Sequence, residues 1–476
     1  MHASLRFVLL AVCLSPAVVG APVAAQELHQ PDRPWALPAP PPLPVAPPPG
    51  QAESLPELLA RVLPRDPQVR VAQLLLAATD ERALQARSRL GPTLSITGSK
   101  GVSQDQDFGR QFERNTDRSE AALRWNLYNF GNDAAELQGA RRDVLAARES
   151  VRQAREEVAE RLADAYTGVL RVQELLPRSQ ARLAAVRRLV EQVRRQAELG
   201  KASDADAQQA QASLLDAEIA HEQLASDLES AQQRLAVLVG GDPRPVLPVT
   251  LPATLPTDAL GTAVAPDTTL LPGQVAVANA RAEAARVRVR PLASMLAPRL
   301  DFEYRQRLSD RTTPQVTTQQ RDGWLVTARW EFPLLGENQA RRAENERRAE
   351  AVEAEAERVL LGVQTERAAL PARLATAQRA VAQLDRQIEQ YRGLLRAGEL
   401  QYEAGRRSLT QLVQLHESQF NAEQRRAEQR ARVLATQLRQ LSLAGTLLPA
   451  LGQGPNLCHP TSQNVRAECM TYVNEM

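Results

Sequence analysis

Hydrophobic residues follow two different periods along this chain. Apolar and polar residues alternate in four short stretches, which lie at 93–97, 121–127, 299–305 and 324–332. Alternation with a period of two predicts strands with two unlike faces. Elsewhere hydrophobic residues recur every three to four positions, most persistently in 132–198, which would extend about 100 Å as one helix. The pattern predicts a mostly helical protein with a small β part.

The whole pattern occurs twice. The phrase Arg124-Trp125 returns as Arg329-Trp330, which is 205 positions later (329 − 124). Glycines return at the same spacing, Gly131, Gly200 and Gly240 being followed by Gly336, Gly405 and Gly445. A period this long is too large for a solenoid unit and indicates a duplicated domain. We expect repeats at 53–245 and 270–448, joined by a linker at 246–269.

Each repeat is expected to contain a strand pair followed by a long α-hairpin. In the first repeat the segment 53–89 has helical spacing and is split by Pro64 and Pro67. Two long helical tracts follow the strands, and Gly200 and Gly405 mark the turns where the chain reverses. Pro177 and Pro371 interrupt the first long tract of each repeat, where a kink or offset is expected.

The strands carry apolar residues on one face and charged residues on the other. A strand pair in lipid places apolar residues outward and charged residues toward a wet lumen. The expected lipid-facing residues are Leu94, Ile96, Leu123, Trp125, Phe302, Tyr304, Trp324, Val326 and Trp330. Strands of about 9 to 11 residues cross an outer membrane when tilted. Four strands cannot close around water, so oligomerisation is required. The segments 98–118 and 306–323 are then expected to be surface loops.

The two ends of the chain have distinct compositions. Residues 1–25 fit a secretory signal cleaved after Ala25, so the mature protein is expected to leave the cytoplasm. A leader at 26–52 is too rich in proline for helix or sheet. The polar tail 449–476 contains Cys458 and Cys469, for which either a disulfide or two free thiols is compatible with the sequence.

Charge and composition exclude several classes of function. The chain has 58 Lys and Arg against 56 Asp and Glu, with the signs interleaved, so nothing indicates nucleic-acid binding. The five histidines are scattered, and no metal-ligand spacing or Gly-rich phosphate loop occurs. We expect no enzyme activity, no metal and no cofactor. Abundant alanine and more than one polar helix face favour a hollow helical barrel over a solid coiled coil.

Between about 55 and 448 the chain resembles the TolC-like outer membrane factors of type I secretion and multidrug efflux. The resemblance rests on the strand pair followed by Tyr128-Asn129-Phe130-Gly131 or Pro333-Leu334-Leu335-Gly336, and on the stretches 402–409 and 441–447. It implies a homotrimer with a twelve-stranded β-barrel in the outer membrane of a Gram-negative bacterium, continued by a long periplasmic α-helical barrel. It also implies a periplasmic adaptor and an energised inner-membrane pump as partners.

The resemblance also implies site residues at the periplasmic tip. Asp206, Tyr402 and Arg407 occupy the positions of a latch that holds the closed tip through charge-assisted hydrogen bonds. The turn glycines Gly200 and Gly405 mark the hairpin tips that would contact the adaptor. Gln411 and Gln414 would line the pore there. They stand where the family can carry aspartates, which makes strong cation selectivity doubtful.

Three functions remain open at this point. The first is the exit duct of a type I protein secretion system, exporting a protein such as a haemolytic toxin with an ABC transporter, because the chain lacks the convincing acylation cysteine of many drug-efflux relatives. The second is the outer-membrane component of a multidrug or metal efflux pump, with an RND pump as the inner-membrane partner. The third is a periplasmic coiled-coil adaptor without a pore, which would not need the alternating strands.

Overall fold

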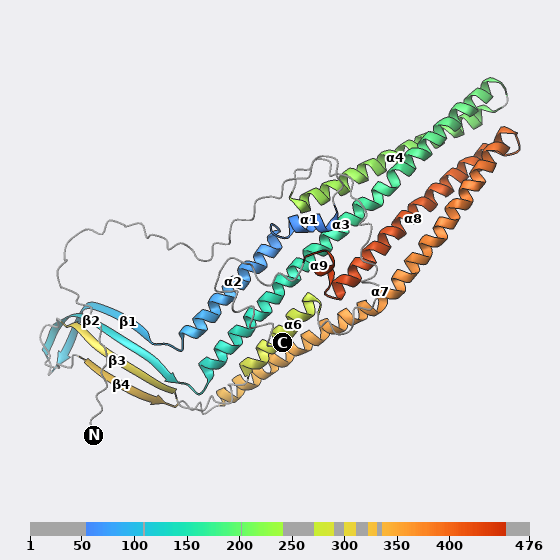
Figure 1. Ribbon diagram of the computed structural model, residues 1–476. Helices are drawn as coiled ribbons and strands as arrows, with labels where there is room; N and C mark the ends of the chain where they lie inside the picture. The colour runs from blue at the N-terminus through green and yellow to red at the C-terminus, as the bar shows by residue number, and fades with distance from the viewer. Residues whose placement is uncertain are drawn as a thin grey trace. The chain divides into compact units, whose positions relative to one another are not determined.

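The computed structural model describes residues 54–107, 110–200, 202–240, 271–289, 299–310, 322–330 and 336–453. The expected signal, leader, linker and cysteine pair lie outside these ranges. The described part is mostly helical, with one small sheet (Figure 1). The fold class expected from the sequence is thereby confirmed.

The first repeat contains six elements. They are α1 (Leu55–Val62), α2 (Pro67–Ser88), β1 (Thr93–Asp107), β2 (Arg110–Tyr128), α3 (Asn132–Glu198) and α4 (Asp204–Val239). From α2 onward, the second repeat shows the same order of elements. Its elements are α6 (Gly273–Val289), β3 (Arg299–Asp310), β4 (Asp322–Arg329), α7 (Glu337–Glu403) and α8 (Leu409–Leu443), followed by the short α9 (Leu447–Ala450).

The ends of the long helices show the duplication in backbone geometry. Helices α3 and α7 both have 67 residues, and each follows a glycine in the left-handed region, Gly131 at φ 87° and Gly336 at φ 78°. Ser203 and Ser408 cap α4 and α8 by accepting a hydrogen bond from the backbone N–H three residues later. The repeats therefore share one local design, because the same turn chemistry recurs 205 positions apart.

The long helices continue past their internal prolines. Pro177 lies inside α3 and Pro371 inside α7, and each helix remains one element from end to end. The kink or offset expected at these prolines stays a prediction. Buried residues lie on both sides of each proline, Leu175 and Ser179 in α3 and Leu370 and Ala377 in α7, and each proline lacks the N–H that would donate within the helix.

The four strands form one antiparallel sheet in the order β1-β2-β3-β4. The expectation of a surface loop at 98–118 is wrong, because β1 and β2 stay paired as far as Asp107 and Arg110. This part of the hairpin has few apolar residues, Val102 among them, so the sequence gives no alternation there. Backbone hydrogen bonding does not require that alternation, and the ladder continues. The second expected loop, 306–323, is likewise wrong at its ends, because β3 continues to Asp310 and β4 begins at Asp322. The segment 311–321 between them lies outside the described residues.

The long helices pack side by side in the order α4, α3, α8, α7, with α2 and α6 against α3 (Figure 1). The largest buried cluster joins α1 and α9 to the middle of α3, the end of α4 and the end of α8; Leu58, Leu162, Tyr166, Leu235 and Leu438 belong to it. A second cluster near the turns joins the two hairpins, with Val193 and Ala210 from the first and Leu409 and Leu412 from the second.

The order of packing leaves two different edges. Helix α4 and strand β1 lie at the first-repeat edge, while α7 and strand β4 lie at the second-repeat edge. None of the described helices combines the length and the apolar character needed to span a membrane.

Candidate functional site

The apolar residues of the four strands share one face of the sheet. The register places Leu94 opposite Leu123, Leu123 opposite Tyr304, and Tyr304 opposite Trp324. A second row runs from Trp125 through Phe302 to Val326. Directly opposite residues in a sheet point to the same side. The structure therefore brings the predicted strand residues together in continuous rows.

This apolar face lacks a cover among the described residues. Trp324 is 72% exposed, Ile96 71% and Leu94 68%, and Trp330 just beyond β4 is 54% exposed. An apolar patch of this kind on a folded chain marks a surface that meets lipid or another protein.

The other face of the same sheet is charged. Arg124, Glu303 and Arg305 come from β2 and β3, and Glu303 accepts hydrogen bonds from Arg124 Nε at 2.9 Å and Arg305 Nε at 2.8 Å. Glu120 lies 3.9 Å from Arg305 in the same group. These side chains are exposed or half-buried, so they need water on their side of the sheet. The sheet thus separates an apolar side from a wet, charged side.

At the hairpin tips the structure gives Asp206 a local partner. Its carboxylate accepts hydrogen bonds from the backbone N–H of Ser203 at 3.2 Å and from the Ser203 hydroxyl at 2.8 Å. The Ser203 hydroxyl in turn accepts from the Asp206 N–H at 3.1 Å. This is a capping box at the start of α4. Asp206 therefore stabilises the turn of its own hairpin.

The other two expected latch residues lie on the second hairpin. Burial raises the pKa of the Tyr402 phenol, and the negative charge of Asp206 adds to that rise, so the two side chains are within electrostatic reach. Arg407 donates to the side-chain oxygen of Gln401 at 3.4 Å. Within the described ranges no hydrogen bond or ion pair joins Asp206 to Tyr402 or Arg407. The latch stays a prediction.

The remaining tip residues lie around the two turns. Gly200 and Gly405 adopt φ values of 72° and 71°, which favour glycine strongly, and both are exposed. Gln411 and Gln414 are exposed on the first turns of α8, and Gln411 is the counterpart of Asp206 in the second repeat. Across the hairpins the Thr410 hydroxyl donates to the Gln209 side chain at 3.1 Å. Polar contacts between the two tips are therefore few.

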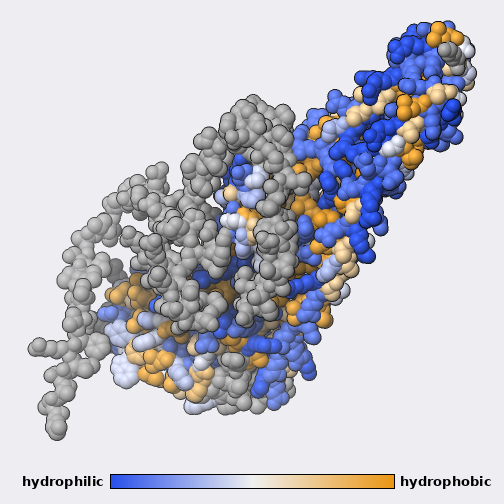
Figure 2. Space-filling view, turned by 45° about the vertical axis from the view of Figure 1, so that its right-hand side comes forward, coloured by the Kyte–Doolittle hydropathy of each residue, from blue (hydrophilic) through white to orange (hydrophobic). Residues whose placement is uncertain are grey.

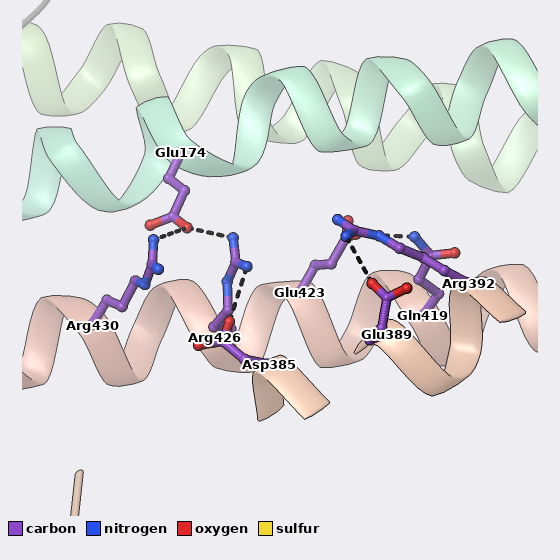
Figure 3. Close-up of polar contacts among 8 residues, drawn as sticks. All are labelled: Glu174, Asp385, Glu389, Arg392, Gln419, Glu423, Arg426 and Arg430. Carbon is purple, nitrogen blue, oxygen red and sulfur yellow. Dashed lines mark hydrogen bonds and ion pairs between the residues drawn. The ribbon is translucent and has the colours of Figure 1, made fainter. Parts of the chain in front are cut away.

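Farther from the turns, arginines of α8 connect both repeats (Figure 3). The Arg426 guanidinium donates to Glu174 of α3 at 2.8 Å and to Asp385 of α7 at 3.2 Å. Arg430 adds a third contact, to Glu174 at 3.2 Å. Arg426 is only 9% exposed, so its charge depends on these carboxylates. We call the four residues Glu174, Asp385, Arg426 and Arg430 the α8 ion cluster.

A second bridging arginine lies near the end of α8. Arg439 donates to Glu160 of α3 at 2.8 Å and, through two nitrogens, to Glu366 of α7 at 2.8 and 2.9 Å. These hydrogen bonds lower the pKa of Glu366. The Ser442 hydroxyl also donates to Glu160. Helix α8 is thus fastened to α3 and α7 at two levels, whereas the tips rely mainly on apolar packing.

The sequence prediction missed both bridging arginines. Each belongs to a helix rich in Arg and Glu, where charge is usually solvated. The available signal was position: Arg426 adjoins the buried Ala427, and Arg439 adjoins the buried Leu438. A charge next to a hydrophobic seam requires a partner, although the seam does not identify which carboxylate supplies it.

The surface of the hairpins is predominantly hydrophilic, with hydrophobic patches at their ends (Figure 2). The large exposed hydrophobic residues near the turns are Leu199, 70% exposed, and Leu400, 68% exposed. A patch of this kind at the end of a charged arm is typical of a contact site.

Known proteins share this arrangement of sheet and hairpins. VceC, an outer membrane protein of Vibrio cholerae, has a TM-score of 0.70 at 18% identity, and the match covers 84% of this chain and 96% of VceC. The CmeC outer membrane channel of Campylobacter jejuni gives 0.69 at 12% identity, with 87% and 89% covered. The open MtrE outer membrane channel of Neisseria gonorrhoeae gives 0.64 at 18%, with 84% and 89% covered. The chain therefore has the fold of these outer membrane channels.

Residues 58–241 match the family described as outer membrane efflux protein, which covers the first repeat. Comparison with curated proteins finds no match. The resemblance to the TolC-like outer membrane factors is confirmed by the family match together with the fold. The matched family is a family of channels rather than of enzymes.

Proposed function

We propose that this protein is an outer-membrane exit duct that works as a homotrimer. The carrying observation is the pair of unlike sheet faces, with continuous apolar rows on one side and Arg124, Glu303 and Arg305 on the other. Lipid outside and water inside a barrel would satisfy both faces at once. The protein lies in the outer membrane and extends into the periplasm.

The open edges support assembly into a ring. One chain offers β1 at one edge of the sheet and β4 at the other, so the two edges are different surfaces. Contacts between unlike edges are head-to-tail and generate a closed ring when the rotation per copy fits. Three copies supply twelve strands, which can enclose a wet lumen where four cannot. The long helices of the same three copies continue the passage into the periplasm.

The hairpin tips are the proposed contact with the other machine components. Gly200, Gly405 and the exposed Leu199 and Leu400 lie at or near the turns of the two hairpins, each separated from its strand pair by a helix of 67 residues. A periplasmic adaptor binds there and connects the duct to an inner-membrane pump, which supplies the energy. Asp206, Tyr402 and Arg407 restrain the tip until the adaptor binds, and Gln411 and Gln414 line the passage.

We propose two alternative classes of cargo. Export of a protein through a type I system with an ABC transporter is the first proposal, and it rests on the sequence argument that the chain lacks a convincing acylation cysteine. Efflux of drugs or metal ions with an RND pump is the second candidate, and the description of the matched family as an efflux protein favours it. The alternative of a pore-free adaptor is less well supported, because such a protein has no use for the four-stranded sheet.

The duct itself is tested on the purified, full-length mature protein. Native mass spectrometry in detergent should give a trimer, and planar bilayers should show discrete conductance steps after insertion. A monomer that never conducts, even after partner proteins are added, contradicts the proposal.

The cargo is tested in cells by removing the gene and restoring it on a plasmid. Loss of one large protein from the culture supernatant, with accumulation inside the cell, supports type I export and identifies the passenger. An unchanged set of secreted proteins, together with increased susceptibility to drugs or metal ions, favours efflux instead.

A further inference from the structure

We infer that the outer faces of α4 and α7 form a charge-complementary seam between neighbouring copies of this chain, with acidic side chains on α4 and arginines on α7. The inference deepens the proposed ring and rests on it. It assigns particular residues to an interface for which the repeat pattern alone gives no chemistry.

The first observation is a difference in charge between equivalent helices. Helix α4 contains seven Asp and Glu residues against one arginine, a formal charge of −6. Its counterpart α8 contains three Glu against five arginines, a formal charge of +2. Helix α8 lies between α3 and α7, whereas α4 lies at an edge. The acidic excess is therefore concentrated on the edge helix, where a neighbouring copy would bind.

Only part of the acidic charge on α4 is compensated within the chain. Glu218 pairs with Arg187 of α3 at 3.0 Å. Glu222 and Asp227 are exposed, and among the described residues no cation lies within ion-pair distance of either. Ile219, which is 54% exposed, follows the buried Ala210 by nine residues, so it lies roughly half a turn around the helix and marks the side of α4 turned away from α3. Glu222 and Asp227 flank this outward side. Glu222 and Asp227 are therefore available to a partner.

Helix α7 as a whole is close to neutral, with 12 Asp and Glu residues against 11 arginines, but it carries arginines on its outward face at the other edge. It buries Ala377, Ile388 and Leu395 on the side that faces the rest of the chain. Arg386 lies nine residues from both Ala377 and Leu395, so it points roughly half a turn away from that side. Arg379 has the same relation to Ile388. Both arginines are exposed, and within the described ranges neither has an ion-pair partner.

Small residues and an apolar side chain accompany these arginines. Ala372, Gly393 and Leu400 continue the same line at intervals of seven residues, and Leu400 is 68% exposed. Small residues permit a neighbouring helix to approach closely, while Leu400 adds apolar area. The acidic face of α4 likewise contains Leu215 and Ile219 among its charges. Both faces thus combine apolar area with charge, as protein interfaces do.

The charged groups of the two faces also lie at similar distances from the hairpin turns, measured along the helix axes. The turn glycines Gly200 and Gly405 lie at the same point of the two repeats, so distances along both helices can be counted from them. Asp227 is 27 residues from Gly200 and Arg379 is 26 residues from Gly405, a difference of about 1.5 Å along the axes. Glu222 and Arg386 are 22 and 19 residues away, a difference of about 4.5 Å. Each acid therefore meets an arginine when the turns of neighbouring copies are level.

The test uses charge reversal on the full-length mature protein, with trimer content read by native mass spectrometry. Reversing the acidic edge (Glu222→Lys with Asp227→Lys) or the basic edge (Arg379→Glu with Arg386→Glu) should each lower the trimer fraction about tenfold, because like charges then oppose one another. The combined variant restores opposite charges and should recover the trimer to within about twofold of the parent. Arg373→Glu, on α7 but about a third of a turn from Arg379, is the matched control and should have little effect.

Cysteine cross-linking tests directly whether α4 of one copy lies beside α7 of its neighbour. Gln223 and Ala382 both lie 23 residues from their turn glycines. With Cys458 and Cys469 replaced by Ser, the Gln223→Cys and Ala382→Cys double variant should give covalent trimers with a short thiol cross-linker. A trimer without cross-links, or without rescue by the combined reversal, overturns the seam and leaves the ring intact. Cross-links from Gln223→Cys to an adaptor instead of this chain also overturn it. A parent protein that is only monomeric contradicts the ring itself.

Discussion

Helices α3 and α7 have the same length and the same type of beginning, yet their surroundings differ. Helix α3 packs against α2, α4, α6 and α8, whereas among the described elements α7 packs mainly against α6 and α8. Large residues such as Leu162, Tyr166 and Leu175 are almost fully buried in α3. Helix α7 buries a narrow seam at intervals of seven, through Ala356, Val363, Leu370 and Ala377. The backbone is the same in both repeats, but α3 is a central helix, the spine of the molecule, whereas α7 lies at an edge.

The difference between spine and edge predicts unequal costs for the same core substitution. Leu162→Ala should destabilise the fold by about 2–5 kcal/mol, since Leu162 is 1% exposed in the largest cluster. Leu370→Ala in α7 should lower the free energy of unfolding by an amount near the lower end of that range. Helix α7 has neighbours on one side only, so the surrounding residues can relax into the cavity more easily. Urea unfolding followed by circular dichroism measures both values. Equal losses would show that α3 and α7 are equally well packed.

The α8 ion cluster predicts a second, intermediate effect. Arg426→Met leaves Asp385 without its cation and Glu174 with Arg430 alone, and should cost about 1–3 kcal/mol because Arg426 is buried. Arg430→Met, whose side chain is 48% exposed, is the matched control and should cost less than about 1 kcal/mol. The same unfolding experiment measures both. If both variants lower the free energy of unfolding by the same amount, the α8 ion cluster does not connect α7 to α3.

The tip provides a prediction about conductance. Asp206→Asn retains a side chain that can accept from Ser203 while removing the charge that faces Tyr402. If the latch restrains the closed tip, single-channel conductance in planar bilayers should rise roughly twofold or more. Ser203→Ala weakens the helix cap without removing the carboxylate and serves as the control. An unchanged conductance in Asp206→Asn assigns Asp206 to the capping box alone.

The smallest expected effect is a change in the pH dependence of stability, and it concerns His416 of α8. Burial lowers the pKa of the imidazole, and the nearby Arg182 and Arg188 lower it further, while Glu399 lies 4.0 Å away. The unfolded chain then binds a proton more readily than the folded chain, so stability falls as the pH drops through the normal histidine range. His416→Gln should remove this part of the pH dependence. Melting temperatures of both proteins between pH 8 and pH 5 measure it, and parallel curves would exclude a role for His416.

Much of the fold could be predicted because the signals were local and occurred twice. Gly131 and Gly336, Gly200 and Gly405, and Ser203 and Ser408 each set a turn or a cap from a few adjacent residues. The alternation around Trp125 and Trp324 predicted the shared apolar face. The extension of β1 to Asp107 could not be predicted, because a ladder with two polar faces leaves no alternation in the sequence.

The site was less predictable than the fold. Tyr402 and Asp206 were placed at the tip by position relative to the turn glycines, and the structure puts them within electrostatic reach. The capping role of Asp206 was missed, although Ser203 three residues earlier is its sequence signature. Arg426 with Glu174 and Asp385 joins residues up to 252 positions apart, and such pairing depends on how whole helices pack.

The sheet of one chain stops at four strands, and this limit has a genetic consequence. If the passage is completed only by neighbouring copies, one defective copy inactivates every trimer into which it assembles. In a cell that makes equal amounts of sound and faulty chains, only roughly one ring in eight would contain three sound copies. A defective allele that still assembles should therefore be dominant over the normal one, whereas an allele that cannot assemble should be recessive.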